Sequence, residues 1–351
     1  MNPFSAYRGI RLNGRFINSE DLHSVEPTDS FEKEVLDYCI HLFDDGNDTV
    51  VTTSGSTGAP KELVFPKSAL IKSAEETNDY FNLHSQSKAL LCLPLQYVAA
   101  KLMVVRAVVG EFELITKMPA INPLKDLTKT ISFVPMTPHQ AATALLDSPK
   151  AFDLVEILLL GGGKVSRELR GKLSELAVKS FIGFGMAETL THFALNKISR
   201  DTGSHFHKLS DVKITTDERG CLVVNRPGIT EGNLLTNDLV ELTDEGFKWL
   251  GRIDNLINSG GVKIIPEEVE QSLHSIIDSN FFIAGIPDSM LGMKVVLFIE
   301  GSEKPDLEKV DFQEKYHRPK EIINMKTFLY TRSGKIRRKE TVQQRLGFTD
   351  C

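Results

Sequence analysis

Apolar segments that end in glycine and are followed by helical segments constrain the fold of this chain most. The run "FDLVEILLLGGG" leads a strand-like segment into three glycines, and the helical pattern "VSRELRGKLSELAV" follows it. The run "KSFIGFGMAE" then repeats the strand-then-glycine form. This alternation predicts an α/β sheet, in which ligands gather beyond the carboxyl ends of the strands. We therefore expect the loops at Gly161, Gly183 and Gly185 to meet in one crevice.

The segments before these strands fit the same class of fold. "KSALIKSAEETNDYFNL" predicts a helix with Ser68 as its N-cap, and "KALLCLPL" and "ISFVPMTP" predict strands. After about Gly203 the segments become shorter, and Asp244-Glu245-Gly246 predicts a tight turn between two strands. The sequence predicts a large N-terminal α/β domain over 1–251 and a small α+β domain over 252–351.

Composition excludes several classes of protein. The chain has 351 residues, of which 41% are hydrophobic and 25% are charged, with a formal net charge of -6. An acidic chain is not expected to bind nucleic acid, which favours a basic surface. No apolar run approaches the roughly 18 residues of a membrane span, and the N-terminal residues lack the apolar core of a signal peptide. Four scattered cysteines without a CxxC pair favour a reducing cytoplasm over a disulfide framework.

One loop is rich in hydrogen-bond donors. The stretch "TTSGSTGAPKELVFPK" begins at Thr52, and two strand-like segments flank its Ser- and Gly-rich centre. Glycines let backbone N–H groups turn inward, hydroxyl groups add donors, and a lysine adds a positive charge, so the loop could surround a phosphate. A solvated hairpin turn is the alternative. The candidate phosphate-binding residues are Ser54, Gly55, Ser56, Thr57, Gly58 and Lys61.

Four separated segments together resemble one family, the acyl-adenylate-forming superfamily of acyl-CoA synthetases, adenylation domains and luciferases. "TSGSTGAPK" resembles its phosphate-binding signature and "GFGMAET" its adenine and magnesium motif. "NDLVELTDEGFKWLGRIDNLINSGGVKIIPEEVE" resembles its ribose and hinge block, and "SGKIRRK" resembles its C-terminal lysine motif. The resemblance implies a large N-terminal domain, reduced here at its N-terminus, and a mobile C-terminal domain.

The resemblance implies a reaction and a set of nucleotide-binding residues. The phosphate loop would hold ATP while a carboxylate attacks the α-phosphate, with Thr57 among the catalytic residues. Glu188 would bind Mg²⁺, and Asp238 and Arg252 would lie at the ribose and phosphate. Phe184 stands where the family usually has a tyrosine that stacks on adenine. The remaining residues implied at the nucleotide are Gly162, Gly183, Gly185, Met186 and Thr189.

The same resemblance implies two catalytic steps with the C-terminal domain in two positions. Lys335 would bridge the carboxylate and α-phosphate oxygens during adenylation. Asp254 would be the hinge, and Gly260 and Gly261 would line the tunnel of the thiol cofactor, coenzyme A. The partners are thus a small carboxylic acid, ATP and coenzyme A.

The acid-binding region departs from the usual family pattern. Gln96-Tyr97 replaces an aromatic-His pair after "LPL", and "LPLQYVAAKLMVVRA" resembles compact bacterial o-succinylbenzoate–CoA ligases of menaquinone biosynthesis. One carboxylate of that dicarboxylic acid reacts, so the other needs a polar or cationic partner. The candidates are Tyr97, Lys101, Arg106, Thr137 and His139; solvated helix charges and a helix cap are the alternatives.

Two further functions stay open at this stage. The chain could adenylate another aryl acid or load a carrier protein. It could also be a nucleotide-binding regulator that has lost catalysis, although both Glu188 and Lys335 are present.

Overall fold

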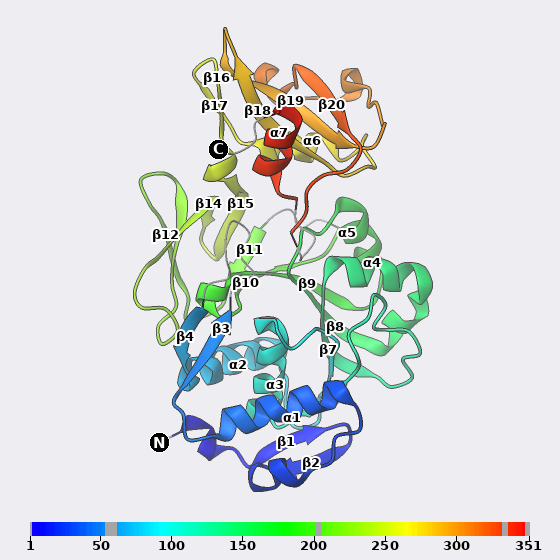
Figure 1. Cartoon of the computed structure of the whole chain (residues 1–351), viewed down its shortest axis with the longest axis vertical. Coiled ribbons are helices and arrows are strands. Elements are labelled where there is room, and N and C mark those ends of the chain that lie inside the picture. Colours follow the sequence, from blue (N-terminus) through cyan, green and yellow to red (C-terminus); the bar gives the residue numbers. More distant parts are fainter. Residues whose placement is uncertain (1, 53–61, 201–204, 332–335, 348–351) are drawn as a thin grey trace. The chain divides into compact units, whose positions relative to one another are not determined.

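The computed structural model describes residues 2–52, 62–200, 205–331 and 336–347. These residues form two compact units (Figure 1). Unit 1 comprises Met1–Lys213 and Val224–Leu234, and unit 2 comprises Ile214–Val223 and Leu235–Cys351. The expected boundary after residue 251 falls within unit 2, and a pivot of the chain near that point stays a prediction.

The helices and strands of unit 1 alternate along much of the chain. The helices are α1 (Ser30–Phe43), α2 (Lys67–Phe81), α3 (Val98–Gly110), α4 (Pro138–Asp147) and α5 (Arg167–Ser174). The strands are β1 (Gly9–Leu12), β2 (Arg15–Asn18), β3 (Asp48–Thr52), β4 (Glu62–Pro66), β5 (Lys88–Leu91), β6 (Glu113–Thr116), β7 (Ile131–Met136), β8 (Val155–Leu160), β9 (Lys179–Gly185), β10 (His192–Lys197) and β11 (His205–Lys208). The predicted α/β sheet is confirmed.

The sheet of unit 1 runs in the order β11-β10-β9-β8-β7-β5-β6-β1-β2. Strands β9, β8, β7, β5, β6 and β1 are parallel to their neighbours, whereas β10, β11 and β2 are antiparallel additions. Because Leu160 of β8 lies opposite Ile182 of β9, Gly161 after β8 lies at the same edge of the sheet as Gly183 and Gly185, which are the last residues of β9. A crevice at this edge stays a prediction.

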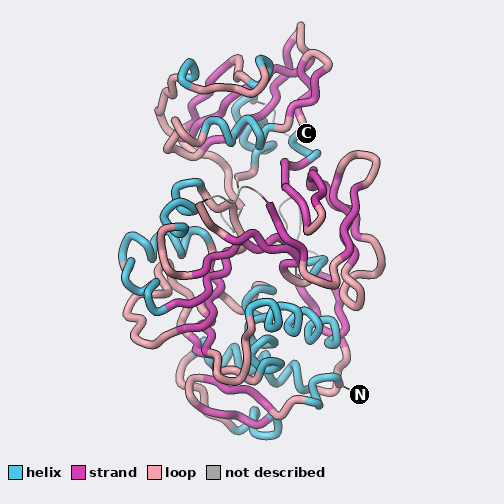
Figure 2. The backbone as a smooth tube through the Cα atoms, turned by 180° about the vertical axis from the view of Figure 1, so that it is seen from behind, coloured by secondary structure: helices cyan, strands magenta, loops and turns pink. Residues whose placement is uncertain are grey.

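Helices cover both faces of this sheet (Figures 1 and 2). On one face, Phe81 of α2 packs against Phe133 of β7 and Phe181 of β9, with ring centroids 5.2 and 5.1 Å apart. On the other face, residues of α4 and α5 such as Ala141 and Leu169 join the buried cluster under the sheet. The apolar residues of β7 alternate between the two layers, as expected for a strand that is buried on both faces.

The start of α2 differs from the predicted N-cap at Ser68. Pro66 occupies the N-cap position and Lys67 is the first helical residue. Lys67 is fully buried, and its Nζ donates to the carbonyl oxygen of His41 at 2.7 Å and contacts Asp44 Oδ1 at 2.6 Å. A lysine that binds the C-terminal end of α1 therefore sets where α2 begins, and local capping preference does not.

Unit 2 holds a hairpin region and a small α+β region. Its helices are α6 (Pro266–Leu273) and α7 (Arg338–Leu346). Its strands are β12 (Lys213–Thr216), β13 (Cys221–Asn225), β14 (Leu234–Thr243), β15 (Gly246–Arg252), β16 (Ile257–Ser259), β17 (Val262–Ile264), β18 (Phe281–Asp288), β19 (Gly292–Glu300) and β20 (Glu321–Met325), although β12, β13 and β14 begin or end in unit 1. The predicted turn at Asp244-Glu245-Gly246 joins β14 to β15.

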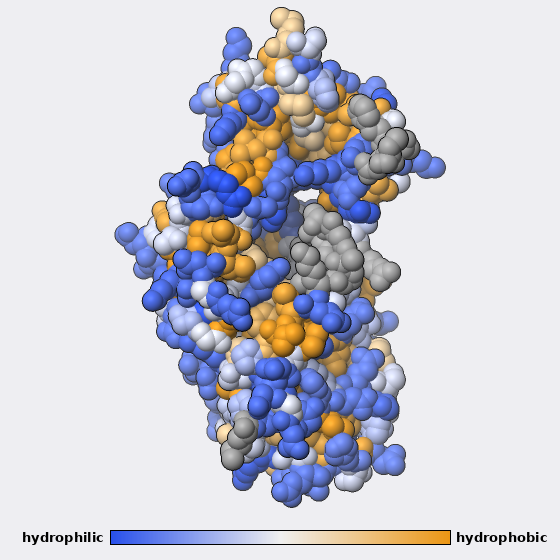
Figure 3. All heavy atoms as spheres, turned by 60° about the vertical axis from the view of Figure 1, so that its left-hand side comes forward, coloured by the Kyte–Doolittle hydropathy of each residue, from blue (hydrophilic) through white to orange (hydrophobic). Residues whose placement is uncertain are grey.

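Both faces of the small sheet in unit 2 are covered by apolar packing. The sheet has the order β17-β16-β19-β18, and β20 pairs with β19. Val269 and Leu273 of α6 pack on one face, and Val342 and Leu346 of α7 pack against the cluster on the other. No helix among the described residues is long and apolar enough to cross a membrane. Figure 3 shows apolar side chains in separate patches between hydrophilic ones on the visible face.

Candidate active site

The predicted phosphate loop lies outside the described residues, and strands β3 and β4 flank it. Strands β3 and β4 form an antiparallel pair in which Thr52 lies opposite Glu62. The segment 53–61, which carries Ser54, Gly55, Ser56, Thr57, Gly58 and Lys61, therefore connects two paired strands. A role of these residues in phosphate binding stays a prediction.

Close backbone approach explains two glycines of the predicted adenine motif. A Cβ on Gly185 would lie 2.2 Å from the carbonyl oxygen of Thr191, and one on Gly183 would lie 3.2 Å from the Cβ of His192. Only glycine fits at residue 185, because β10 pairs directly with β9 there. Phe184 lies between them and packs against Phe193 and Phe206, with ring centroids 5.7 and 5.1 Å apart.

The residues after β9 form a tight, internally bonded turn. Glu188 is half-buried in the 3-10 helix Ala187–Thr189, and the Oγ1 atom of Thr189 accepts from the Met186 N–H at 3.0 Å. The Thr189 hydroxyl is thus engaged with the backbone of its own turn, and its expected contact with a nucleotide stays a prediction. Gly162, at the end of β8, has a φ of +81° that suits glycine.

The carboxylate chemistry of this turn fits a magnesium ion that arrives with a nucleotide. Mg²⁺ is commonly held by one or two carboxylates together with substrate phosphates. Among the residues that the structure describes, no group of three or more His, Cys, Asp and Glu side chains could hold a metal. Glu188 would therefore bind the ion together with phosphate oxygens of the nucleotide.

The five predicted acid-binding residues are not equivalent. Lys101 lies with its Nζ 5.6 Å from the ring centroid of Tyr38 in α1, and burial lowers its pKa. Thr137 is the N-cap of α4, where its Oγ1 accepts from the Gln140 N–H at 3.1 Å. His139 is exposed in the first turn of α4, and Tyr97 is the partly exposed N-cap residue of α3. The helix cap, which was the alternative expected for His139, is Thr137 instead.

Arg106 is the exception, because its guanidinium is almost fully buried. The side chain, on α3, is 2% exposed. Its Nη2 lies 3.3 Å from Thr191 Oγ1, its Nη1 lies 3.6 Å from the Sδ atom of Met103, and its Nε has no partner among the described residues. Burial and the neighbouring Arg226 lower the pKa of Arg106 to about 9, so the group stays charged near pH 7. A buried cation with two weak acceptors has unused capacity to bind an anion.

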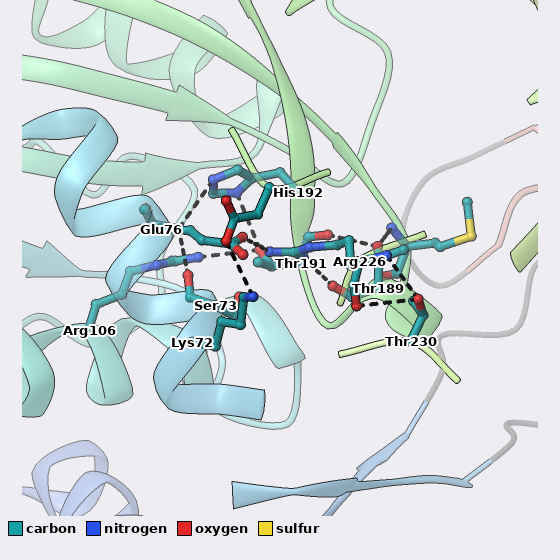
Figure 4. Close-up of polar contacts among 12 residues, drawn as sticks. Lys72, Ser73, Glu76, Arg106, Thr189, Thr191, His192, Arg226 and Thr230 are labelled. Carbon is teal, nitrogen blue, oxygen red and sulfur yellow. Dashed lines mark hydrogen bonds and ion pairs between the residues drawn. The ribbon is translucent and has the colours of Figure 1, made fainter. Parts of the chain in front are cut away.

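The residues that surround Arg106 were not predicted from the sequence. His192, Arg226, Glu76 and Thr191 lie around it in unit 1 (Figure 4). Burial, together with the charges of Arg106 and Arg226, lowers the pKa of His192 well below its usual value, so this imidazole is neutral at pH 7. Thr191 and His192 directly follow the "GFGMAET" motif, which could have indicated them. Nothing in the sequence around Arg226 indicated its position.

A second group of predicted residues comes together within unit 2. Asp238 of β14 accepts from Trp249 Nε1 at 3.0 Å and lies 3.7 Å from Arg252 Nη1. Arg252 Nη2 also lies 2.7 Å from Asp254 Oδ2, which Asn237 Nδ2 approaches at 3.3 Å. Partial burial opposes the ionised form of Asp254, but the hydrogen bond from Arg252 outweighs it and lowers the Asp254 pKa. The predicted ribose and hinge carboxylates thus share one arginine.

The remaining predicted residues of unit 2 divide into one turn and one undescribed segment. Gly260 and Gly261, with φ of +58° and +84°, form the two-residue turn between Ser259 of β16 and Val262 of β17. Two positive φ values in such a turn require glycine or a similar residue. Lys335 lies outside the described residues, and a bridge between Tyr330 and Ile336 bounds the segment that contains it. The roles of these residues stay predictions.

Comparison with known proteins gives the chain a family. A family model described as AMP-binding enzyme matches residues 26–235. A probable 2-succinylbenzoate–CoA ligase of Mycobacterium tuberculosis is 30% identical over 291 residues, which are 76% of this chain and 74% of that protein. The 2-succinylbenzoate–CoA ligase of Enterococcus faecalis is 26% identical over 327 residues, or 82% and 67% of the two chains.

Solved structures share the fold. An acyl-CoA synthetase (AMP-forming)/AMP-acid ligase II-like protein from Dyadobacter fermentans is 32% identical, with a TM-score of 0.65 over 93% of this chain and 98% of that chain. The o-succinylbenzoate CoA synthetase of Bacillus subtilis, in complex with its acyl-adenylate intermediate, has a TM-score of 0.78 over 96% and 95% at 17% identity. The second likeness shows the fold alone. The predicted superfamily is confirmed, and the chain belongs to the AMP-binding enzyme family of AMP-forming ligases.

Proposed function

We propose that this chain is an ATP-dependent acid–CoA ligase that converts 2-succinylbenzoate to 2-succinylbenzoyl-CoA in menaquinone biosynthesis. The acid would first form an acyl-adenylate with release of pyrophosphate, and the thiol of coenzyme A would then displace AMP. The names of the relatives support this substrate, and the chemistry around Arg106 supports it independently. The presence of ATP and coenzyme A in the cytoplasm makes that compartment the proposed location.

The observation that carries the substrate assignment is the buried Arg106. Its Nη2 contacts Thr191, two residues beyond the last residue of the "GFGMAET" motif. A carboxylate is a far better acceptor for a guanidinium than a hydroxyl or a thioether, because the pair is charged and can be bidentate. The second carboxylate of the acid would therefore take the position that the Thr191 hydroxyl holds. The buried charge would then be paired, and the attraction would offset part of its desolvation cost.

The other residues of unit 1 would serve the first half-reaction. Thr57 and Lys61, with the other donors of the loop, would bind the phosphates whose charge increases as pyrophosphate leaves. Glu188 would bind Mg²⁺, which supplies charge stabilisation at the phosphates when bound. The Gly183–Gly185 segment would let adenine approach the backbone beside Phe184. In unit 2, Asp238 would accept hydrogen bonds from the ribose hydroxyls, and Arg252 would hold this carboxylate in place.

Product analysis tests the proposal. Purified protein is incubated with ATP, Mg²⁺, coenzyme A and 2-succinylbenzoate, and the thioester and AMP are quantified by mass spectrometry. We expect one thioester and one AMP for each ATP consumed. Formation of the adenylate without thioester would favour transfer to a carrier protein, and no acid-dependent consumption of ATP would contradict the proposal.

A further inference from the structure

A buried ion pair lies beside Arg106 in unit 1. Arg226, in the segment after β13, is 1% exposed, and its Nη2 pairs with Glu76 Oε2 of α2. Its Nη1 donates to the carbonyl oxygen of Thr189 at 2.5 Å, and no residue that the structure describes bonds to its Nε. Figure 4 shows Arg226 between Glu76 and Thr189. Two buried arginines and one largely buried carboxylate thus share this region.

The charges of this cluster do not balance. Arg106 and Arg226 contribute two positive charges and Glu76 one negative charge, while His192 is neutral. Lys72, at the border, pairs with Asp211 at 3.3 Å and leaves this count unchanged. Among the described residues, the cluster therefore has one uncompensated positive charge, which matches a single carboxylate from a ligand. Because Glu76 pairs with Arg226, Arg106 is the buried cation of this part of the structure that has no carboxylate partner.

Helices α2 and α3 would let Glu76 reach Arg106 if Arg226 were absent. The two helices pack together, and Asn78 Nδ2 of α2 donates to the carbonyl oxygen of Arg106 at 3.0 Å. A largely buried carboxylate without its partner is unfavourable, so Glu76 would turn towards another cation of the cluster. Lys72, four residues earlier on α2, already pairs with Asp211, whereas Arg106 has no carboxylate partner among the described residues.

We propose that the Glu76–Arg226 ion pair keeps Arg106 unpaired, so that Arg106 can bind the remote carboxylate of the acid substrate. Arg226 is thereby a positioning residue for acid selectivity. The inference rests on the proposed function for the identity of the substrate. The contact between Glu76 and Arg106 that it predicts for a variant without Arg226 does not depend on the substrate.

Three variants separate this charge role from a merely structural one. Arg226→Met removes the partner of Glu76, Arg226→Lys keeps the charge, and the double variant Glu76→Gln/Arg226→Met removes both charges. The acids are 2-succinylbenzoate and 4-oxo-4-phenylbutanoate, which lacks the ring carboxylate. Asp44→Asn/Lys67→Met is the control, because it removes the ion pair of another buried cation, Lys67, at the start of the same helix.

The expected kinetic result is a pattern across the variants. Arg226→Met should raise the KM for 2-succinylbenzoate by about 10–100-fold, the range for loss of a charged hydrogen bond, with little change for 4-oxo-4-phenylbutanoate. Arg226→Lys and the double variant should retain the preference of the wild type to within about threefold. The control pair should alter thermal stability without altering this preference.

A crystal structure of Arg226→Met provides the readout that does not depend on the substrate. We expect the Glu76 carboxylate within hydrogen-bond distance of the Arg106 guanidinium. A Glu76 side chain that stays away from Arg106 would overturn the inference, as would a double variant or Arg226→Lys that loses acid preference like Arg226→Met. If Arg226→Met does not fold, the acid preferences of the double variant and of Arg226→Lys still test the inference. Equal turnover of both acids by the wild type would overturn the proposed substrate and leave the structural result to decide this inference.

Discussion

The Nη2 atom of Arg106 lies 3.3 Å from the Oγ1 atom of Thr191, and these residues come from α3 and from the turn after the adenine motif. This contact connects the segment that carries Glu188 with the helix that carries the buried cation. A carboxylate bound to Arg106 would therefore lie beside the end of the nucleotide motif.

Arg106→Gln should raise the KM for 2-succinylbenzoate far more than the KM for ATP. Loss of a charge-assisted hydrogen bond costs about 1.5–3 kcal/mol, or about 10–100-fold in kcat/KM. Steady-state kinetics with each substrate varied measures both constants. The control is Lys101→Met on the same helix, whose Nζ lies over Tyr38. Equal effects of the two variants would contradict the role of Arg106.

Thr57→Ala and Lys61→Ala should slow adenylate formation and leave the fold intact. Removing one donor to a developing charge typically costs about 10²–10³ in rate. Exchange of labelled pyrophosphate into ATP measures this half-reaction, and circular dichroism checks the fold. Near-normal exchange in both variants would contradict a phosphate-binding role of the loop.

Glu188→Gln should raise the Mg²⁺ concentration needed for half-maximal adenylation. The amide keeps the shape of the side chain but has no charge, so affinity should fall by about tenfold or more. A titration of Mg²⁺ at saturating ATP measures the change. An unchanged titration curve would show that Glu188 is not the metal ligand.

Lys335→Ala should abolish adenylate formation while leaving thioester formation from supplied acyl-adenylate. Adenylation requires a cation between two groups that repel each other, whereas thiol attack requires that region to be open. Asp254→Pro, which restricts the backbone at the expected hinge, should show the opposite bias or lose the alternation between the two steps. Stopped-flow measurement of each half-reaction tests both variants, and an equal effect of Lys335→Ala on both steps would contradict the alternation.

Glu300 should make unit 2 sensitive to acid. Partial burial opposes ionisation, but hydrogen bonds from Tyr330, Asn280, Phe328 and Thr327 outweigh it and lower the Glu300 pKa from 4.5 to about 2. A lowered carboxyl pKa stabilises the folded state above pH 4.5, and this stability is lost as the pH falls from 4.5 towards 2. Glu300→Gln should therefore flatten the pH dependence of the melting temperature over this window. A profile parallel to that of the wild type would contradict the assignment.

Motifs and periodicity predicted the frame of this molecule better than they predicted its acid-binding cluster. The glycine-ended strands at Gly161 and Gly185 were recognisable, because a parallel sheet forces its loops to one edge. Ser68 was wrong as an N-cap, because the buried contacts of Lys67 outweigh a local preference. Long-range pairing of this kind leaves no local pattern in the sequence.

The sequence also did not show which of the acid-binding candidates would be buried. Lys101 and Arg106 are both cations on one helix, and the sequence did not distinguish them. Burial does, because Arg106 is enclosed next to Arg226 whereas Lys101 lies over Tyr38. The pairing of Glu76 with Arg226 joins residues 150 positions apart in the chain and became visible only in the folded structure.

Pyrophosphate exchange with two acids tests most simply whether Arg106 binds the ring carboxylate. The quantity measured is the ratio of kcat/KM for 2-succinylbenzoate to that for 4-oxo-4-phenylbutanoate. The two acids share the aliphatic keto acid and differ in the ring carboxylate that Arg106 would bind. We expect a ratio of about 10–100 for the wild type, from one charge-assisted contact, and a ratio near one for Arg106→Gln. A wild-type ratio near one would contradict this role of Arg106.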